Sequence, residues 1–345
     1  MPTGSRDAEV LLDWLLQSMG LIRRASSSED GALHKIMREA LLVDPLRGWD
    51  SNELGHQTGL SNTGIHHQMT KLRECGLVSA QVVGKWHRYV LRGGSITGAV
   101  MIVQSQANTI LSLRLSELAA IVAPSDTRMN TEAEETEEPL IIRVSEHGPI
   151  DSDHDSLGSL VQDLGLAGES KRSDDGLALK ILSELCSAHH PITLLGLSER
   201  VSESRGRVGT VIERMRSAGL VERAPMVERI PQDVFGGLVR QLDARGEEWL
   251  MTRGGLGRLE ESVSHVLLTG AKQGDLDIDR VENALSSVRI EDQRVLLNTL
   301  GGRMPYGFRI GGHNGDVVSN KISHRVERVL RRILTVAQRL QDSLS

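Results

Sequence analysis

One pattern of helix caps, apolar spacings and a stop glycine occurs twice in this chain, and no other feature restricts its fold as strongly. Residues 197–223 align without gaps on the stretch that begins 143 positions earlier. The apolar residues of both copies recur at the spacing of one buried helix face: Ile65, Met69 and Leu72 match Val208, Ile212 and Met215. We therefore expect two related helical units, and a length of 345 residues has room for two or three domains.

The first copy lies within residues 51–91 and predicts a short helix, a turn, a longer helix and a two-stranded hairpin. Ser51 and Ser61 are expected to cap the two helices. Gly76 should end the second helix, because glycine accepts positive φ. The predicted strands are residues 77–83 and 86–91, joined by Gly84 and Lys85.

The longer helix of this copy has a polar side opposite its apolar stripe. Its side chains are short to medium in length, and most of them can both donate and accept hydrogen bonds, which suits the reading of base edges in a major groove. This polar side consists of Asn62, Thr63, His66, His67, Gln68 and Lys71. Near the hairpin tip, Lys85 and Arg88 are candidates for contact with phosphate or a minor groove.

The run GLSNTGIHHQMTKLRECGLV at residues 59–78, followed by GKWHRYVL at 84–91, resembles the winged helix-turn-helix of ArsR/MarR-type transcriptional regulators. The resemblance covers about a fifth of the chain. It implies that the second helix enters the DNA major groove, with Ser61 and the polar residues above at the DNA. Metal-sensing ArsR members carry a Cys-x-Cys where this chain has Glu53-Leu54-Gly55-His56, so no metal and no other cofactor is expected.

The second copy has the more basic helix of the two. It should expose Arg205, Arg207, Arg214 and Arg216 against two glutamates, which suits contact with phosphate. The wing of this copy is expected to start at 221–227 and to finish at 248–252. The run at 246–263 is similar to the strand-then-helix ending of MarR-like domains.

The predicted fold is mainly α with small β-hairpin wings, as tandem winged helix-turn-helix domains plus accessory helices. The expected segments are an N-terminal helix (1–28), a first winged domain (29–94), a long apolar helix (95–123), an acidic linker (124–172), a second winged-helix-like domain (173–265) and a C-terminal helical region with a Gly-rich hairpin (266–345). Within the last region a hairpin is predicted to turn at Gly311–Gly315, and Arg303, Arg309 and Lys321 could add a third nucleic-acid contact.

Two long helices leave the mode of assembly open. The predicted helix at 96–122 has an apolar seam that either pairs in a homodimer or packs within one chain. The closing helix at 319–344 has a second apolar stripe with the same two alternatives, and an arginine-rich flank. A twofold dimer would place half-sites about one helical turn, ~34 Å, apart, whereas tandem domains in one chain could span two adjacent grooves.

Composition excludes several classes of function. Two isolated cysteines, Cys75 and Cys186, cannot form a disulfide framework or a Cys-rich zinc module, and both are expected to be buried. Aromatic residues are 2% of the chain, too few for a single-strand stacking platform. No catalytic constellation, secretory signal or membrane span is seen, so we expect neither an enzyme nor a membrane protein.

These observations predict a cytoplasmic, nucleoid-associated regulator that binds double-stranded DNA sequence-specifically, with a homodimer as the expected assembly. The alternative is a winged-helix scaffold for protein interactions in chromosome or transcription assemblies, which the net charge of −6 favours mildly. The sequence leaves open the operator, any small-molecule effector, activation or repression, and whether the second domain binds DNA or protein.

Overall fold

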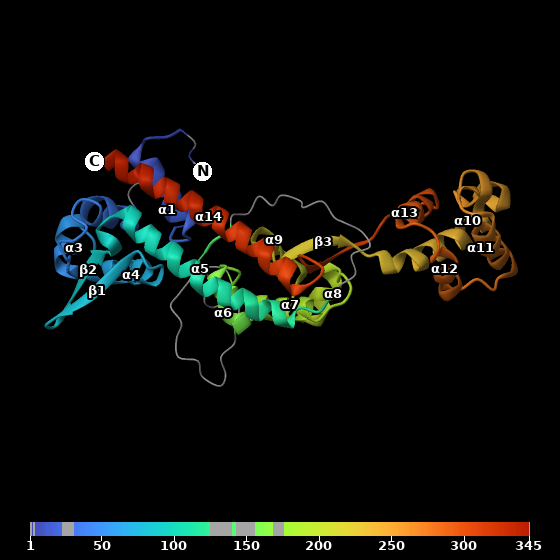
Figure 1. The fold of residues 1–345 in the computed structure, drawn as a ribbon, viewed down its shortest axis with the longest axis horizontal. Coiled ribbons are helices and arrows are strands. Elements are labelled where there is room, and N and C mark those ends of the chain that lie inside the picture. Colours follow the sequence, from blue (N-terminus) through green and yellow to red (C-terminus); the bar gives the residue numbers. More distant parts are fainter. Residues whose placement is uncertain are drawn as a thin grey trace.

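The computed structural model describes residues 2, 4–22, 31–124, 140–142, 156–167 and 176–344. Over these residues it is mainly helical, with two small antiparallel two-stranded sheets. Two long helices, α5 (Ile96–Ile121) and α14 (Gly315–Leu344), run side by side through the middle of an elongated molecule (Figure 1). Helices α10 to α13 form one end of it.

The first unit contains every element that the repeat predicted. Its elements are α2 (Ala32–Ile36) continued by a π-helical turn (Met37–Leu41), α3 (Ser51–Thr58), α4 (Asn62–Glu74), β1 (Val78–Val83) and β2 (Trp86–Leu91). Ser61 caps α4, as expected, and Gly76 follows the helix with φ +80°. The predicted cap of α3 is wrong: Asp50 is the cap, since its carboxylate accepts from the Asn52 and Glu53 amides.

The second unit repeats these elements, and up to β3 it does so at the predicted offset. It consists of α7 (Leu177–Cys186), α8 (Leu194–Arg200), α9 (Arg205–Ala218), β3 (Val221–Pro225) and β4 (Tyr306–Ile310). Asn62 and Arg205, which begin α4 and α9, lie 143 positions apart. Ser204 caps α9, and Gly219 follows it with φ +83°.

The second sheet differs from the prediction in its partner strand. β3 pairs with β4, Val221 opposite Ile310, whereas residues 248–252 belong to a helix. The expected domain boundary at residue 265 and the expected hairpin at Gly311–Gly315 are therefore wrong, because this segment leads from β4 into α14. From β4 onward the two units match at an offset of 219 positions, as Leu91 and Ile310 show.

The chain between β3 and β4 forms a separate helical domain, residues 226–305. Its helices are α10 (Ile230–Thr252), α11 (Glu261–Gln273), α12 (Ile278–Leu285) and α13 (Ile290–Thr299). They enclose a hydrophobic core of their own, which includes Leu238, Leu267 and Leu297. The domain is thus an insertion at the tip of the second hairpin.

The repeat also includes a helix that the sequence analysis placed in the linker. Residues 160–166, LVQDLGL, match residues 15–21, LLQSMGL. The two stretches end α6 (Ser156–Asp163) and α1 (Ala8–Ser18), and each has a left-handed glycine, Gly165 or Gly20. The predicted linker at 124–172 is therefore interrupted by α6, and its acidic residues lie mostly outside the described part of the chain.

The two halves of the molecule exchange their long helices. The first half of α5 and the second half of α14 complete the core of the first unit, while their other halves complete the core of the second. Helix α1 packs on α14, and α6 packs on α5. This reciprocal arrangement is what an internal twofold axis produces. The apolar stripes of α5 and α14 are thus covered within one chain. Packing within one chain was one of the two alternatives that the sequence left open, and pairing in a homodimer was the other.

The apolar seam that was predicted for residues 96–122, now part of α5, differs in burial between its two ends. Ile96 and Leu118 are buried, whereas Ile121 is 49% exposed. Within the described part of the chain, no helix combines the length and the apolar character that crossing a membrane requires.

Candidate nucleic-acid interface

Helix α4 separates its buried and its open residues cleanly. Ile65, Met69 and Leu72 are at most 1% exposed and pack in the first core. On the other side Ser61, Asn62, Thr63, His66 and His67 are exposed, and Gln68 and Lys71 are half-buried. All seven predicted residues of this helix and its cap therefore lie on or beside one open surface.

The start of this surface is braced by helix α3. The Asn62 Nδ2 donates to Asn52 Oδ1 at 3.4 Å, and the Ser61 hydroxyl accepts from the Gly64 amide at 3.2 Å. Asn52 is exposed beside Asn62. It was not among the predicted residues, although its place in the first turn of the preceding helix could have indicated it.

The two predicted basic residues of the first hairpin differ in their surroundings. Lys85 is exposed at the tip, beside Gly84. The Arg88 guanidinium instead donates from Nη1 to the Gly48 carbonyl at 3.0 Å. The side chain is engaged in holding the hairpin to the loop before α3, which makes it a poor phosphate ligand.

Basic residues outnumber acidic ones in α4 and the first hairpin. Residues 61–92 contain Lys71, Arg73, Lys85, Arg88 and Arg92 against one acidic residue, Glu74, which is exposed at the end of α4, although the whole chain has a net charge of −6. Two of these cations have partners in the chain, since Arg88 and Arg92 donate to backbone carbonyls. A surface that is locally basic on an acidic protein is suited to a polyanion.

The corresponding arginines of the second unit are partly neutralised. Arg205 is exposed at the start of α9. Arg207 forms an ion pair with Glu203, Nη1 to Oε1 at 2.5 Å, and Arg214 donates to the Leu166 carbonyl at 3.2 Å. Arg216 pairs with Glu213 at 2.8 Å. The predicted basic helix is present, but most of its guanidinium groups have partners in the chain.

The second hairpin has its cations bound as well. Glu222 on β3 accepts from Arg309 Nε through Oε1 and from Lys321 Nζ through Oε2, each at 2.9 Å. The predicted third contact through Arg309 and Lys321 is therefore not supported, because the two cations share one carboxylate. Arg303, the remaining residue of that prediction, is exposed.

A neighbouring arginine joins α9 to α14. Arg325 donates from Nη1 to the Arg216 and Ser217 carbonyls at the end of α9, at 2.7 and 2.8 Å. Burial and the nearby Arg328 lower the pKa of its guanidinium. It is a structural cap for the helix end.

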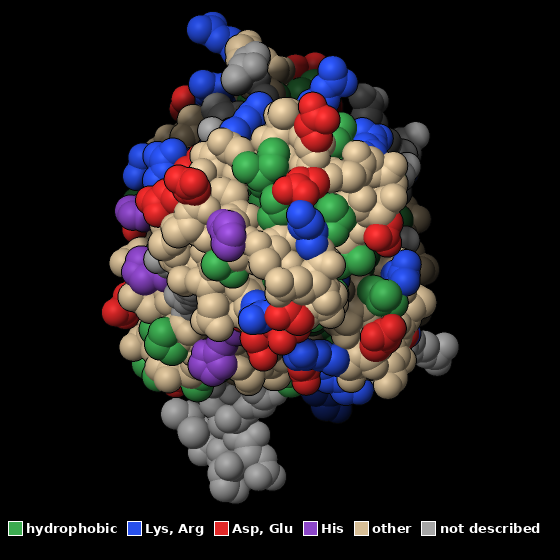
Figure 2. Space-filling model, turned by 90° about the vertical axis from the view of Figure 1, so that its right-hand side faces the viewer, with side chains coloured by type: hydrophobic (Ala, Val, Ile, Leu, Met, Phe, Trp, Pro, Cys, Tyr) green, Lys and Arg blue, Asp and Glu red, His purple; other side chains and the backbone are tan. Residues whose placement is uncertain are grey.

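One face of the inserted domain carries charges of both signs. Figure 2 looks onto the end of the molecule that α10 to α13 form, and acidic, basic and apolar side chains alternate on this face. Such a mixture gives a polyanion no preferred surface.

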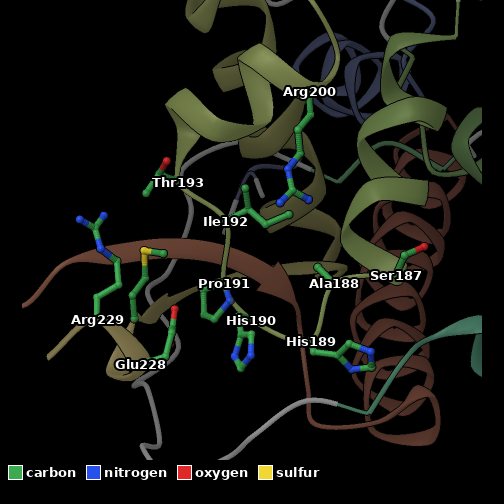
Figure 3. Close-up of a pocket in the computed structure, with 11 residues that line it drawn as sticks. Ser187, Ala188, His189, His190, Pro191, Ile192, Thr193, Arg200, Glu228 and Arg229 are labelled. Atoms are coloured by element: carbon green, nitrogen blue, oxygen red, sulfur yellow. The ribbon is translucent and has the colours of Figure 1, made fainter. Parts of the chain in front are cut away.

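A pocket of about 500 Å³ lies where the inserted domain joins the second unit (Figure 3). Its polar residues do not converge: Arg200 pairs with Glu184 at 3.3 Å, and the rings of His189 and His190 point in different directions. The His189 ring lies 3.4 Å from the Pro124 carbonyl.

The surroundings of both cysteines disfavour the thiolate form. Burial raises the pKa of both the Cys75 and the Cys186 thiol to about 12, so neither is a thiolate at neutral pH. Among the residues with described positions, no group of three or more His, Cys, Asp or Glu side chains is placed to hold a metal ion.

Comparison of the chain with models of known protein families, with curated proteins and with solved structures finds no match.

Proposed function

We propose that the two units are winged helix-turn-helix domains similar to those of ArsR/MarR-type regulators, and that the chain is a sequence-specific, DNA-binding transcriptional regulator. In this assignment α3 and α4 are the helix-turn-helix of the first domain, and β1 and β2 are its wing. Trp49 adds a short third strand by exchanging hydrogen bonds with Tyr89. Ile192 and Phe308 do the same in the second domain, at the same offsets.

The open face of α4 is the observation that carries the proposal. A helix whose apolar stripe is fully buried, and whose opposite side exposes an amide, a hydroxyl and two imidazoles, fits a major groove. The chain covers none of His66, His67, Asn62 or Thr63 with its own described elements. In this proposal they and Gln68 read bases, and Lys71 and Lys85 contact phosphate.

The second domain has a supporting role in this proposal. Arg205 at the start of α9 contacts phosphate and fixes the register of the protein on the duplex. Because α5 and α14 already join the two domains as two subunits would be joined, one chain is sufficient for a two-part site. The predicted homodimer stays a prediction, and the buried seam of α5 gives it no support.

The runner-up function is a protein-interaction scaffold. It is favoured by the inserted domain, which occupies the position of the second wing, and by the ion pairs that neutralise α9 and β3. In that case α10 to α13 would hold the partner, and the open face of α4 would have no ligand.

Retardation of a selected duplex is the experiment that decides between the two. We expect wild-type protein to select a preferred sequence from a random pool, with affinity that falls steeply as salt rises. Gln68→Ala should weaken binding about tenfold at the preferred sequence and relax the choice at one base pair. Lys85→Ala should weaken all sequences alike and reduce the salt dependence by about one ion.

Gln232→Ala is the matched control, since Gln232 is an exposed glutamine on the inserted domain. It should bind like the wild type. Equal losses for Gln68→Ala on every sequence would remove base reading from the proposal. Absence of any retardation, with a stable protein partner recovered through α10–α13, would establish the scaffold instead.

A further inference from the structure

The tip of the first hairpin is apolar and open to solvent. Val82 is 69% exposed, Val83 is 52% exposed and Trp86 is 59% exposed. The strand register pairs Val83 with Trp86 and Val82 with His87, so the apolar groups lie on both sides of the hairpin around Gly84 and Lys85. Three large apolar side chains thus sit within five positions at the end of a protrusion.

This exposure is not needed for folding. The core side of the hairpin is already formed by Val78, Tyr89 and Leu91, each at most 3% exposed. Trp49 is 3% exposed, and Trp14 and Trp249 are half-buried, so Trp86 is the exception among the four tryptophans. An exposed contiguous apolar group usually marks a contact surface.

The charge around the tip restricts what it can contact. Lys85 and His87 are exposed at the tip, and residues 78–92 contain no acidic residue, whereas Arg88 and Arg92 are bound to backbone carbonyls nearer the base of the hairpin. An apolar tip with a basic side chain beside it fits an anionic partner that has an apolar interior. A stacked DNA duplex and an anionic membrane both have these properties.

The position of the tip favours DNA over a membrane. Leu77 and Val78 follow α4 directly and share a core with Ile65 and Leu72, so the base of the hairpin is packed against α4. A partner that met the tip would also meet imidazole, amide and hydroxyl groups along that helix. These groups match base edges and offer little to a lipid surface.

We propose that the tip enters the minor groove next to the major groove contacted by α4, and that Trp86 wedges between two base pairs and bends the duplex. Apolar wedges in minor grooves unstack a base step and kink DNA by about 20–90°. Val82 and Val83 contact the sugar walls, and Lys85 reaches phosphate. This inference rests on the proposed DNA-binding function and adds a deformation at one end of the site, since the second hairpin ends in α10–α13.

The test is the distance between the ends of a selected duplex of about 25 base pairs, measured by energy transfer between end labels. Wild-type protein should shorten this distance. Trp86→Ala should bind about tenfold more weakly and leave the duplex close to straight, while Trp86→Phe should keep part of the bend. Val266→Ser is the control, because Val266 is an exposed valine, 48% accessible, on the inserted domain.

A second duplex separates minor-groove from major-groove contact. Inosine in place of guanine removes the minor-groove amino group and leaves the major-groove edge unchanged. Inosine at the wedged step should strengthen wild-type binding and leave Trp86→Ala unaffected.

Three outcomes would overturn the inference. Retardation with the same affinity and bend for wild type and Trp86→Ala would end it while DNA binding stands. No retardation of any duplex by wild type would remove the proposed function and the inference together. Loss of binding to vesicles containing anionic phospholipid in Trp86→Ala, with DNA bending unchanged, would assign the tip to a membrane.

Discussion

The two hairpins of this chain pair their strands in the same register, but their tips differ. Val78 pairs with Leu91 in the first, and Val221 pairs with Ile310 in the second, at matched positions. The first closes through two residues, Gly84 and Lys85, whereas the second opens into a domain with its own core. The cores of the two units are alike, and divergence is concentrated at the surfaces that a partner would meet.

The two longer helices diverge in the same way. Gln68 on α4 is half-buried and polar, while its counterpart Val211 on α9 is 3% exposed and belongs to a core. Lys71 corresponds to Arg214, which is engaged by the Leu166 carbonyl. The first unit thus leaves this surface open, whereas in the second unit part of it forms internal contacts.

One half of the molecule has a buried ion pair where the other half has uncharged residues. We expect the largest loss of stability when this pair is broken. Arg114 on α5 pairs with Asp163 on α6, and their side chains are 4% and 1% exposed. Burial lowers the pKa of the Arg114 guanidinium. Asp163→Ala would leave that charge unpaired, so unfolding should become easier by about 3–5 kcal/mol. The measurement is the thermal transition by calorimetry.

The other half of the molecule supplies the controls. The equivalent positions hold Ile333 and Ser18, an apolar residue and a small polar one. Ser18→Ala should change the stability by less than about 0.5 kcal/mol, and the double variant Arg114→Ile with Asp163→Ser should recover most of the loss. If the double variant is as unstable as Asp163→Ala, the pair has a role beyond cancelling charge.

A smaller difference is expected at the two glycines that end α4 and α9. Both have left-handed φ values, so alanine should cost roughly 1–2 kcal/mol at Gly76 or Gly219. At Gly219 the new Cβ would lie 2.9 Å from Arg325 Cδ and displace the guanidinium that caps α9. Gly219→Ala should therefore lose about 1 kcal/mol more than Gly76→Ala. Equal shifts of the two melting temperatures would mean that Arg325 moves aside freely.

The sequence predicted these helices well because their determinants are local. Caps, apolar spacing and a stop glycine located α4 and α9, and the predicted cap Ser61 was confirmed. The cap of α3 was missed by one position, because Asp50 and Ser51 are both good caps and only the contact with Glu53 distinguishes them. Exposure of the predicted polar residues of α4 followed from the same periodicity.

The features that the sequence did not predict depend on distant parts of the chain. Strand β4 pairs with a strand on the far side of the inserted domain, and nothing in the run at 306–310 identifies that partner. The partners of Arg88 and Arg309, Gly48 and Glu222, are likewise distant in sequence. Helix α6 was missed for another reason: the similarity of LVQDLGL to LLQSMGL is short and lies outside the main repeat.

We expect the smallest effect on stability from deletion of the inserted domain, which would make the second hairpin like the first. Residues 226–305 can be replaced by Val-Gly-Lys-Trp, the four residues that close the first hairpin. The Met226 amide donates to the Pro305 carbonyl at 2.9 Å, so the two ends of the inserted domain are already at hairpin distance. None of the buried residues of its core belongs to the cores of the two units.

The shortened chain should therefore keep its fold, and the melting temperature of the remaining domain should shift by only a few degrees, about 1 kcal/mol or less. Circular dichroism and calorimetry would measure both, with the excised 226–305 fragment as the companion sample. A separate unfolding transition of a helical fragment would show that the insertion is an independent domain. Together with a folded shortened chain, it would show that β3 and β4 pair without the insertion. Collapse of the shortened chain would show the reverse: the second unit would depend on α10–α13 to hold β3 against β4, and the resemblance between the two hairpins would end at their register.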